Sequence, residues 1–72
     1  MKRFYGHVVE ESMINFYDSL SEKDRRRYAA IEAKKLPYGG QAYISHVLGC
    51  DEKTIRQGLL ELENEKELKK TG

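Results

Sequence analysis

The chain has little of what builds disulfides, metal sites or membrane spans. It contains one cysteine, Cys50, which excludes an internal disulfide and a cysteine-based metal site. The two histidines, His7 and His46, have no partner at ligand spacing. No apolar run approaches the roughly 20 residues of a transmembrane helix, and the start lacks a signal-peptide core. We expect no metal, no cofactor, no membrane partner and a cytoplasmic setting.

The chain also has few residues with which to build a catalytic pocket. A core made by 72 residues rarely encloses a substrate as well, and we find no pairing of nucleophile and base. Charged residues make up 35% of the chain and apolar residues 39%, which is typical of a globular domain. We therefore predict a single domain over residues 1–72 that is not an enzyme.

An excess of charge is lacking overall, because the net charge is only +1. Its distribution is more informative. Residues 21–50 carry six basic and three acidic side chains, whereas the segments on either side each carry one more acid than base. A basic patch is therefore compatible with a nearly neutral molecule.

What the chain does contain is apolar residues at helical spacing. Between residues 10 and 20 they recur at intervals of three and four, as on one face of an amphipathic helix. We predict a helix over about 9–19, whose face belongs to the core or, as an alternative, binds another protein. The residues of this face are Met13, Phe16, Tyr17 and Leu20.

A second helix is predicted over about 22–35, between a capping serine and a proline. The Ser21 hydroxyl can accept a bond from a free amide of the first turn, and Pro37 disfavours helical geometry at the residue before it. Successive residues lie about 100° apart on a helix, so the three arginines 25–27 cannot all share one surface. Small side chains indicate close approach by more than one neighbour: Ala29, Ala30 and Ala33.

The stretch from Gln41 to Leu62 has the features of a helix-turn-helix, in which two short helices cross steeply through a tight turn. We expect Gly49 to adopt the positive φ that the turn needs. Cys50 provides a small apolar plug, which we expect to be largely buried. Ser45 and Gly58 are the small residues expected where the two helices cross.

The predicted helices of this motif cover 41–48 and 52–62, the second capped by Asp51. Their inward-facing residues are expected to be Ile44, Val47, Leu48, Ile55, Leu59 and Leu62. The apolar pattern fades after Leu62, so we place the core at about 20–64 and expect 65–72 to be a frayed tail. The predicted fold is all-α, a three- to four-helix, homeodomain-like helix-turn-helix DNA-binding domain.

The start of the last predicted helix presents polar side chains suited to base edges in the major groove. Arginine can bind guanine through two hydrogen bonds, and glutamine can do the same with adenine. The candidate base contacts are Glu52, Lys53, Arg56 and Gln57. Candidate phosphate contacts lie nearer the middle of the chain. The amides of Gly39 and Gly40 begin a helix, which favours anions, and side chains of suitable chemistry are Gln41, Lys34, Lys35 and Arg26. The arginine run fits a solvated surface equally well.

Three blocks of the sequence, in this order, resemble the N-terminal region of Rhodopirellula-type DDE insertion-sequence transposases. They are residues 20–33, the turn Tyr38-Gly39-Gly40, and residues 48–62. The resemblance implies that the chain recognises the terminal repeats of a mobile element. It also implies that a separate downstream domain cuts and joins DNA with metal-bound carboxylates. Asp51 and Glu52 depart from the family, where Ser or Arg is frequent. Glu52 would either accept a bond from cytosine or weaken binding.

Two other functions remain open at this point. The chain fits a stand-alone helix-turn-helix transcription regulator, and it also fits a helical protein-interaction module that uses the face of the 9–19 helix. The partner of a transposase module or of a transcription regulator is double-stranded DNA. A homodimer, or contact with a downstream catalytic domain, is compatible with the sequence.

Overall fold

The computed structural model describes residues 2–71, with side chains through Glu65. Over this range the chain is entirely helical apart from its turns and N-terminal arm, and it contains no strand. This confirms the predicted all-α class. The helices are α1 (His7–Ser19), α2 (Glu22–Lys34), α3 (Gly40–Leu48) and α4 (Glu52–Thr71).

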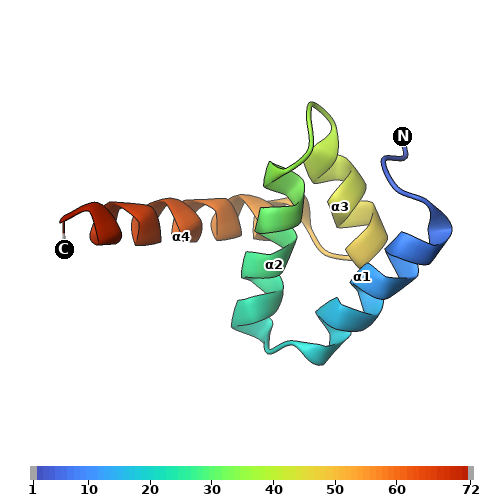
Figure 1. Cartoon of the computed structure of the whole chain (residues 1–72), viewed down its shortest axis with the longest axis horizontal. Helices are drawn as coiled ribbons and strands as arrows, with labels where there is room; N and C mark the ends of the chain where they lie inside the picture. Colours follow the sequence, from blue (N-terminus) through green and yellow to red (C-terminus); the bar gives the residue numbers. More distant parts are fainter. Residues whose placement is uncertain (1, 72) are drawn as a thin grey trace.

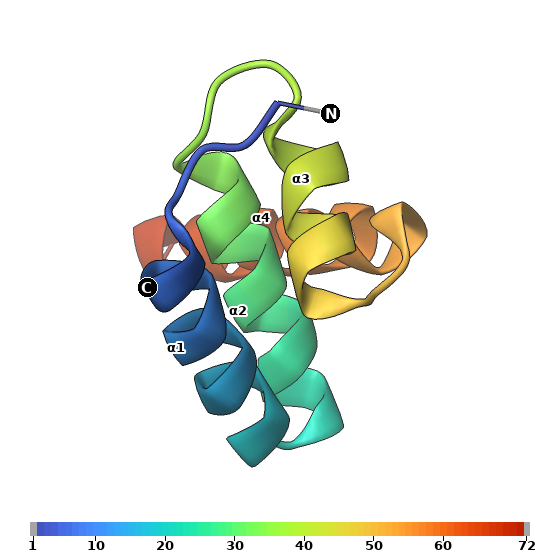
Figure 2. The same cartoon turned by 90° about the vertical axis from the view of Figure 1, so that its right-hand side faces the viewer.

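Helix α2 is the centre of the structure, because its contacts with α4 and α3 are the two most extensive between helices and it also packs against α1. Figure 1 shows α4 beginning beside α3, crossing α2 at a steep angle and projecting well past it. Seen from the side in Figure 2, α1 and α2 lie next to each other, with α3 beside the upper part of α2. The arrangement leaves one long side of α4 uncovered.

The core forms where α2 meets its neighbours, and small side chains allow the close packing. Ala29 and Ala30 have no exposed surface at all, as expected for alanines approached from several sides. The largest fully buried side chains come from the last two helices and pack in one cluster with Ala29. They are Tyr43, Ile44 and Ile55.

Both ends of α2 follow the sequence signals. The Ser21 hydroxyl accepts a hydrogen bond from the Asp24 amide at 3.3 Å, which confirms the predicted cap. The helix ends at Lys34, shortly before Pro37. Gly39 then adopts a φ of 94° to start α3, a conformation that residues with a side chain rarely take.

A turn of three residues, 49–51, joins α3 to α4. Gly49 has a φ of 70°, as predicted. The Ser45 carbonyl accepts from the Gly49 and Cys50 amides at 2.9 and 3.1 Å, and its hydroxyl donates to the Cys50 carbonyl. Ser45 therefore stabilises the turn directly, a role beyond the small crossing residue predicted from the sequence.

Cys50 and Asp51 differ in detail from their predicted roles. Cys50 is half-buried instead of largely buried, and this burial raises the pKa of its thiol, so the neutral form is favoured. At the start of α4 the Thr54 and Ile55 amides bond to the Asp51 carbonyl, at 3.0 and 3.3 Å. Within the described residues, no hydrogen bond from these amides reaches the Asp51 carboxylate that was predicted as the cap.

Two helices are longer than the apolar pattern predicted. α1 begins at His7 instead of residue 9, and α4 continues to Thr71 instead of ending near residue 62. An apolar stripe marks only the part of a helix that contacts the core, so it understates a helix that projects beyond it. The frayed tail predicted for 65–72 has a helical backbone through Thr71. The side chains after Glu65, and residue 72, lie outside the described residues.

Gly58 is a crossing residue, but its neighbour is α2 and not α3 as the sequence motif had led us to expect. A Cβ built on Gly58 would lie 2.5 Å from the Arg26 carbonyl oxygen and 2.8 Å from the Ala30 Cβ. The motif treats α3 and α4 as a pair, whereas the most extensive contact of α4 is with α2. Gly58 therefore fixes how closely α4 approaches α2.

Candidate nucleic-acid interface

The four predicted base contacts occupy one side of α4. Ile55 and Gly58 are buried and turn toward α2, so the opposite side of the helix faces solvent. Residues 52, 53, 56 and 57 span about 140° of the helix circumference on this side, and all four side chains are exposed: Glu52, Lys53, Arg56 and Gln57. We call this side, from Glu52 to Asn64, the outer face of α4.

The start of α3 forms a second candidate contact, beside the first turn of α4. In the described part of the chain the Gln41 and Ala42 amides donate to no backbone carbonyl, as is usual in a first helical turn. Gln41 itself is exposed, and it lines the same shallow hollow as Glu52. The structure thus brings a predicted phosphate contact next to a predicted base contact.

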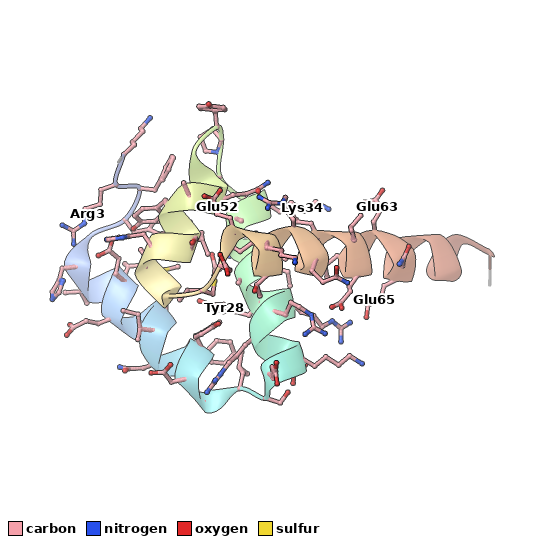
Figure 3. All side chains as sticks on the ribbon, turned by 180° about the vertical axis from the view of Figure 1, so that it is seen from behind. Arg3, Tyr28, Lys34, Glu52, Glu63 and Glu65 are labelled. Carbon is pink, nitrogen blue, oxygen red and sulfur yellow. The ribbon has the colours of Figure 1, made fainter. Side chains whose placement is uncertain are left out.

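Glu52 complicates the electrostatics of this hollow. Free amides at a helix N-terminus favour an anion, but the Glu52 carboxylate lines the same space. Figure 3 shows Glu52 at the beginning of α4, with Lys34 projecting farther along the same edge of the helix in that view. A phosphate bound here would need the cations of α2 to offset the repulsion by Glu52.

The two lysines at the end of α2, Lys34 and Lys35, differ in their ion pairing. Lys35 Nζ lies 3.2 Å from a Glu32 carboxylate oxygen one turn earlier. Lys34 is exposed, and among the described residues it forms no ion pair within 4.0 Å. The Lys35 side chain is 56% exposed although its partner Glu32 is largely buried, so both ammonium groups remain accessible to an anion.

The three consecutive arginines hold the helices together. Arg25 donates to the Tyr17 and Asp18 carbonyls at the end of α1, at 3.0 and 2.8 Å. Arg26 and Arg27 instead pair with carboxylates of α4, Glu61 and Glu65 respectively. This confirms that the three arginines do not all share one surface, since Arg25 faces α1 whereas Arg26 and Arg27 face α4.

Arg26 faces α4 on the side of the predicted base contact Gln57, because its partner Glu61 lies one turn after Gln57. Its Nε donates to both Glu61 carboxylate oxygens at 3.1 Å, and hydrogen bonding to Arg26 holds the pKa of Glu61 below its usual value. Glu61 follows Arg56 by five residues, which is about 140° around the helix. A surface centred on Arg56 therefore does not include Arg26.

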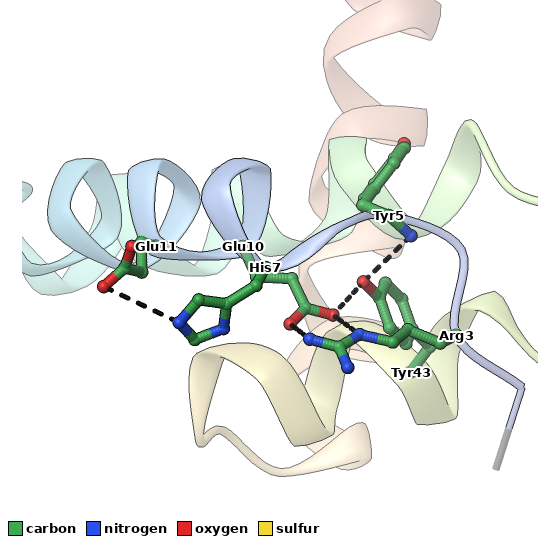
Figure 4. A network of polar contacts seen from close by, with 6 residues as sticks. All are labelled: Arg3, Tyr5, His7, Glu10, Glu11 and Tyr43. Atoms are coloured by element: carbon green, nitrogen blue, oxygen red, sulfur yellow. Dashed lines mark hydrogen bonds and ion pairs between the residues drawn. The ribbon is translucent and has the colours of Figure 1, made fainter.

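The N-terminal arm, residues 2–6, contacts α1 and α3 through polar and aromatic side chains (Figure 4). Arg3 donates two hydrogen bonds to the Glu10 carboxylate, at 2.7 and 3.2 Å. The Tyr43 hydroxyl donates to the same carboxylate and accepts from the Tyr5 amide at 3.2 Å. The Phe4 ring packs edge-on against Tyr43, with 5.3 Å between ring centroids.

This network ties the arm to α1 and α3 through groups far apart in the chain. Tyr43 lies 33 residues from Glu10 and 38 from Tyr5, so no local pattern could have indicated it. Arg3 and then Tyr43 hold the pKa of Glu10 below its usual value by hydrogen bonding to its carboxylate. Residues 3–5 have no regular secondary structure and pair with no strand in the part of the chain that the structure describes.

No helix in the described residues is both long and apolar enough to cross a bilayer. Comparison of the chain with protein-family models, with curated proteins and with solved structures found no match.

Proposed function

We propose that the chain is a DNA-binding module in which α3, the turn 49–51 and α4 act as a helix-turn-helix. The observation that carries the proposal is the outer face of α4. A glycine-based turn leads into a helix whose first two turns expose four polar side chains on the side away from the core. Such a helix fits the major groove, where its N-terminal side chains reach the base edges.

Each side chain on this face has a defined use against base edges. Arg56 suits the two acceptors of guanine, and Gln57 suits the acceptor and donor of adenine. Lys53 can contact guanine or a phosphate. Glu52 can accept from the cytosine amino group, a bond that needs the carboxylate to face the groove and not the backbone.

Phosphate contacts would come from both sides of the loop between α2 and α3. The free amides of α3 and the Gln41 side chain are suited to one phosphate, and Lys34 and Lys35 to others. Tyr38, at the tip of this loop, is fully exposed, and its hydroxyl can donate to a phosphate oxygen. These contacts would fix the position of α4 without reading sequence.

We further propose that the DNA is sequence-specific and belongs to the ends of a mobile element. The assignment to a mobile element depends on the resemblance of residues 20–64 to insertion-sequence transposases. That resemblance implies that a downstream domain cuts and joins the DNA. The same interface would equally serve a transcription regulator. A neighbouring reading frame with the catalytic carboxylates, flanked by inverted repeats, would favour the transposase.

A protein-interaction module is the second candidate, and one observation favours it. Phe16 on α1 remains 52% exposed although its ring packs edge-on against Tyr28 at 5.0 Å. Val8 and Val9, also on α1, are 75% and 48% exposed. An exposed apolar strip of this kind is typical of a docking surface.

Selection from a random pool of DNA duplexes tests the proposal. We expect a short motif to be enriched, and the selected duplex to bind far more tightly than a scrambled one at physiological salt. Binding that shows no enrichment would limit the function to non-specific contact with phosphates. Absence of DNA binding would favour the α1 surface as the functional site.

A further inference from the structure

The outer face of α4 contains a leucine that base reading does not use. Leu60 is 61% exposed, about two turns beyond the start of the helix. It borders a shallow, mostly apolar hollow formed with Leu59 and with the side chains of Arg56 and Glu63. An apolar group between opposite charges is a poor match to a phosphate backbone but a good match to another protein surface.

The charges beside Leu60 are arranged so that the face is complementary to itself. Arg56 and Glu63 are seven residues apart, so they lie within about 20° of each other around the helix and about 10 Å apart along it. A two-fold axis midway between them would place Arg56 of each copy opposite Glu63 of the other. The same axis would bring Leu59 and Leu60 of the two copies together.

We propose that two copies of the chain associate through this face, with their α4 helices antiparallel. A two-fold interface uses the same patch on both partners, so each complementary contact occurs twice. The approach is open because α2 covers the opposite side of α4, where Ile55 and Gly58 are buried. The projection of α4 beyond the other helices leaves room for the second copy (Figure 1).

The association would be weak, and it would compete with DNA. One helix face buries less than the approximately 1,200 Å² that stable interfaces need, so we expect a dissociation constant in the high-micromolar range. The dimer would cover Arg56, and the same side chain is needed to contact bases. The outer face of α4 could therefore bind either a second copy or DNA, but not both at once. This competition rests on the proposed function, whereas the association itself does not.

A charge exchange tests the association. In Arg56→Glu, two carboxylates would face each other across the interface, and in Glu63→Arg two guanidinium groups would do so. We expect each single variant to self-associate at least ten-fold more weakly than the original chain. An equal mixture of the two variants should regain association, because each introduced charge then meets an opposite one. Sedimentation over a concentration series measures all three, with circular dichroism to verify helix content.

Two further variants separate the proposed face from general effects of charge and apolar surface. Leu60→Gln should weaken association without changing charge. Glu11→Arg reverses an exposed charge on α1, which makes no contact with α4 in the part of the chain that the structure describes, and should leave association unchanged. A single variant that associates like the original chain, a mixture no stronger than its components, or a chain that stays monomeric at millimolar concentration would each overturn the proposal.

The DNA arm of the experiment gives a separate result. If the original chain dimerises, raising its concentration should lower the free monomer fraction available to the selected duplex. Leu60→Gln should self-associate less, so its DNA binding should rise in proportion to its total concentration. Dimerisation without any effect on DNA binding would refute the competition but not the dimer. Absence of DNA binding would refute the proposed function and leave the sedimentation result intact.

Discussion

Gly58 in α4 lies directly against the backbone of α2 at Arg26. A Cβ at this position would come within 2.5 Å of the Arg26 carbonyl oxygen. Because that oxygen belongs to a helix backbone, it cannot move aside as the end of a flexible side chain could. The contact therefore determines the depth at which α4 packs, and with it the direction in which the outer face points.

Gly58→Ala should destabilise the domain. Alanine is the better helix former by about 1 kcal/mol, but the added methyl would force α2 and α4 apart, and overpacking of this kind typically costs roughly 1–3 kcal/mol. Chemical denaturation measures the difference. Asn64→Ala, at an exposed position of the same helix, is the matched control and should be neutral or slightly stabilising. A Gly58→Ala variant as stable as the control would show that the helices are not in this close contact.

Gly49→Val should also destabilise the domain, for a different reason. A Cβ at Gly49 would meet nothing within 4 Å, so the cost comes from the φ of 70° alone. We expect a loss of roughly 1–3 kcal/mol in the free energy of unfolding. Gly49→Asn should lose much less, since asparagine tolerates this conformation better than other residues with a side chain. Equal losses in the two variants would argue against backbone conformation as the cause.

Stability should fall in acid because two carboxylates gain partners on folding. Hydrogen bonds from Arg3 and Tyr43 lower the pKa of Glu10, and those from Arg26 lower the pKa of Glu61. Unfolded glutamate titrates at about 4.3. The stabilisation is therefore fully present above this value and is lost as the pH falls through the lower folded pKa.

Denaturation between about pH 6 and about pH 3 measures this effect. The original chain should lose stability over the lower half of the range, and Glu10→Gln and Glu61→Gln should each show a shallower loss. Glu63→Gln is the control, since Glu63 is exposed and the described residues give it no ion pair. A control with as shallow a profile as Glu61→Gln would show that the pairing with Arg26 is not responsible.

Much of the fold could be predicted because its signals are local. Ser21 and Pro37 bound α2, and Gly49 marks the turn, each through backbone chemistry confined to a few residues. The alanines of α2 also indicated its central place, since small side chains are needed where several helices meet.

The remaining features depend on contacts between distant residues. The pairing of Arg26 with Glu61 and the network of Tyr43 with Glu10 join helices whose relative positions the sequence does not state. The length of α4 was underestimated because its apolar stripe ends at Leu62, whereas the helix continues through the polar pairing of Glu65 with Arg27. The outer face of α4 was easier to predict. Once Ile55 is placed in the core, helical geometry gives the residues on the opposite, exposed side. Exposure alone does not show which molecule binds this face.

The most direct test of the account compares Arg56→Ala with Lys34→Ala on a selected and a scrambled duplex at several salt concentrations. Arg56→Ala should lose about 1–3 kcal/mol on the selected duplex and little on the scrambled one. Lys34→Ala should weaken both equally and reduce the salt slope by about one. Lys23→Ala, an exposed cation at the other end of α2, should change neither. If Arg56→Ala weakens both duplexes equally, or leaves both unchanged, the outer face of α4 does not read bases and the central claim is wrong.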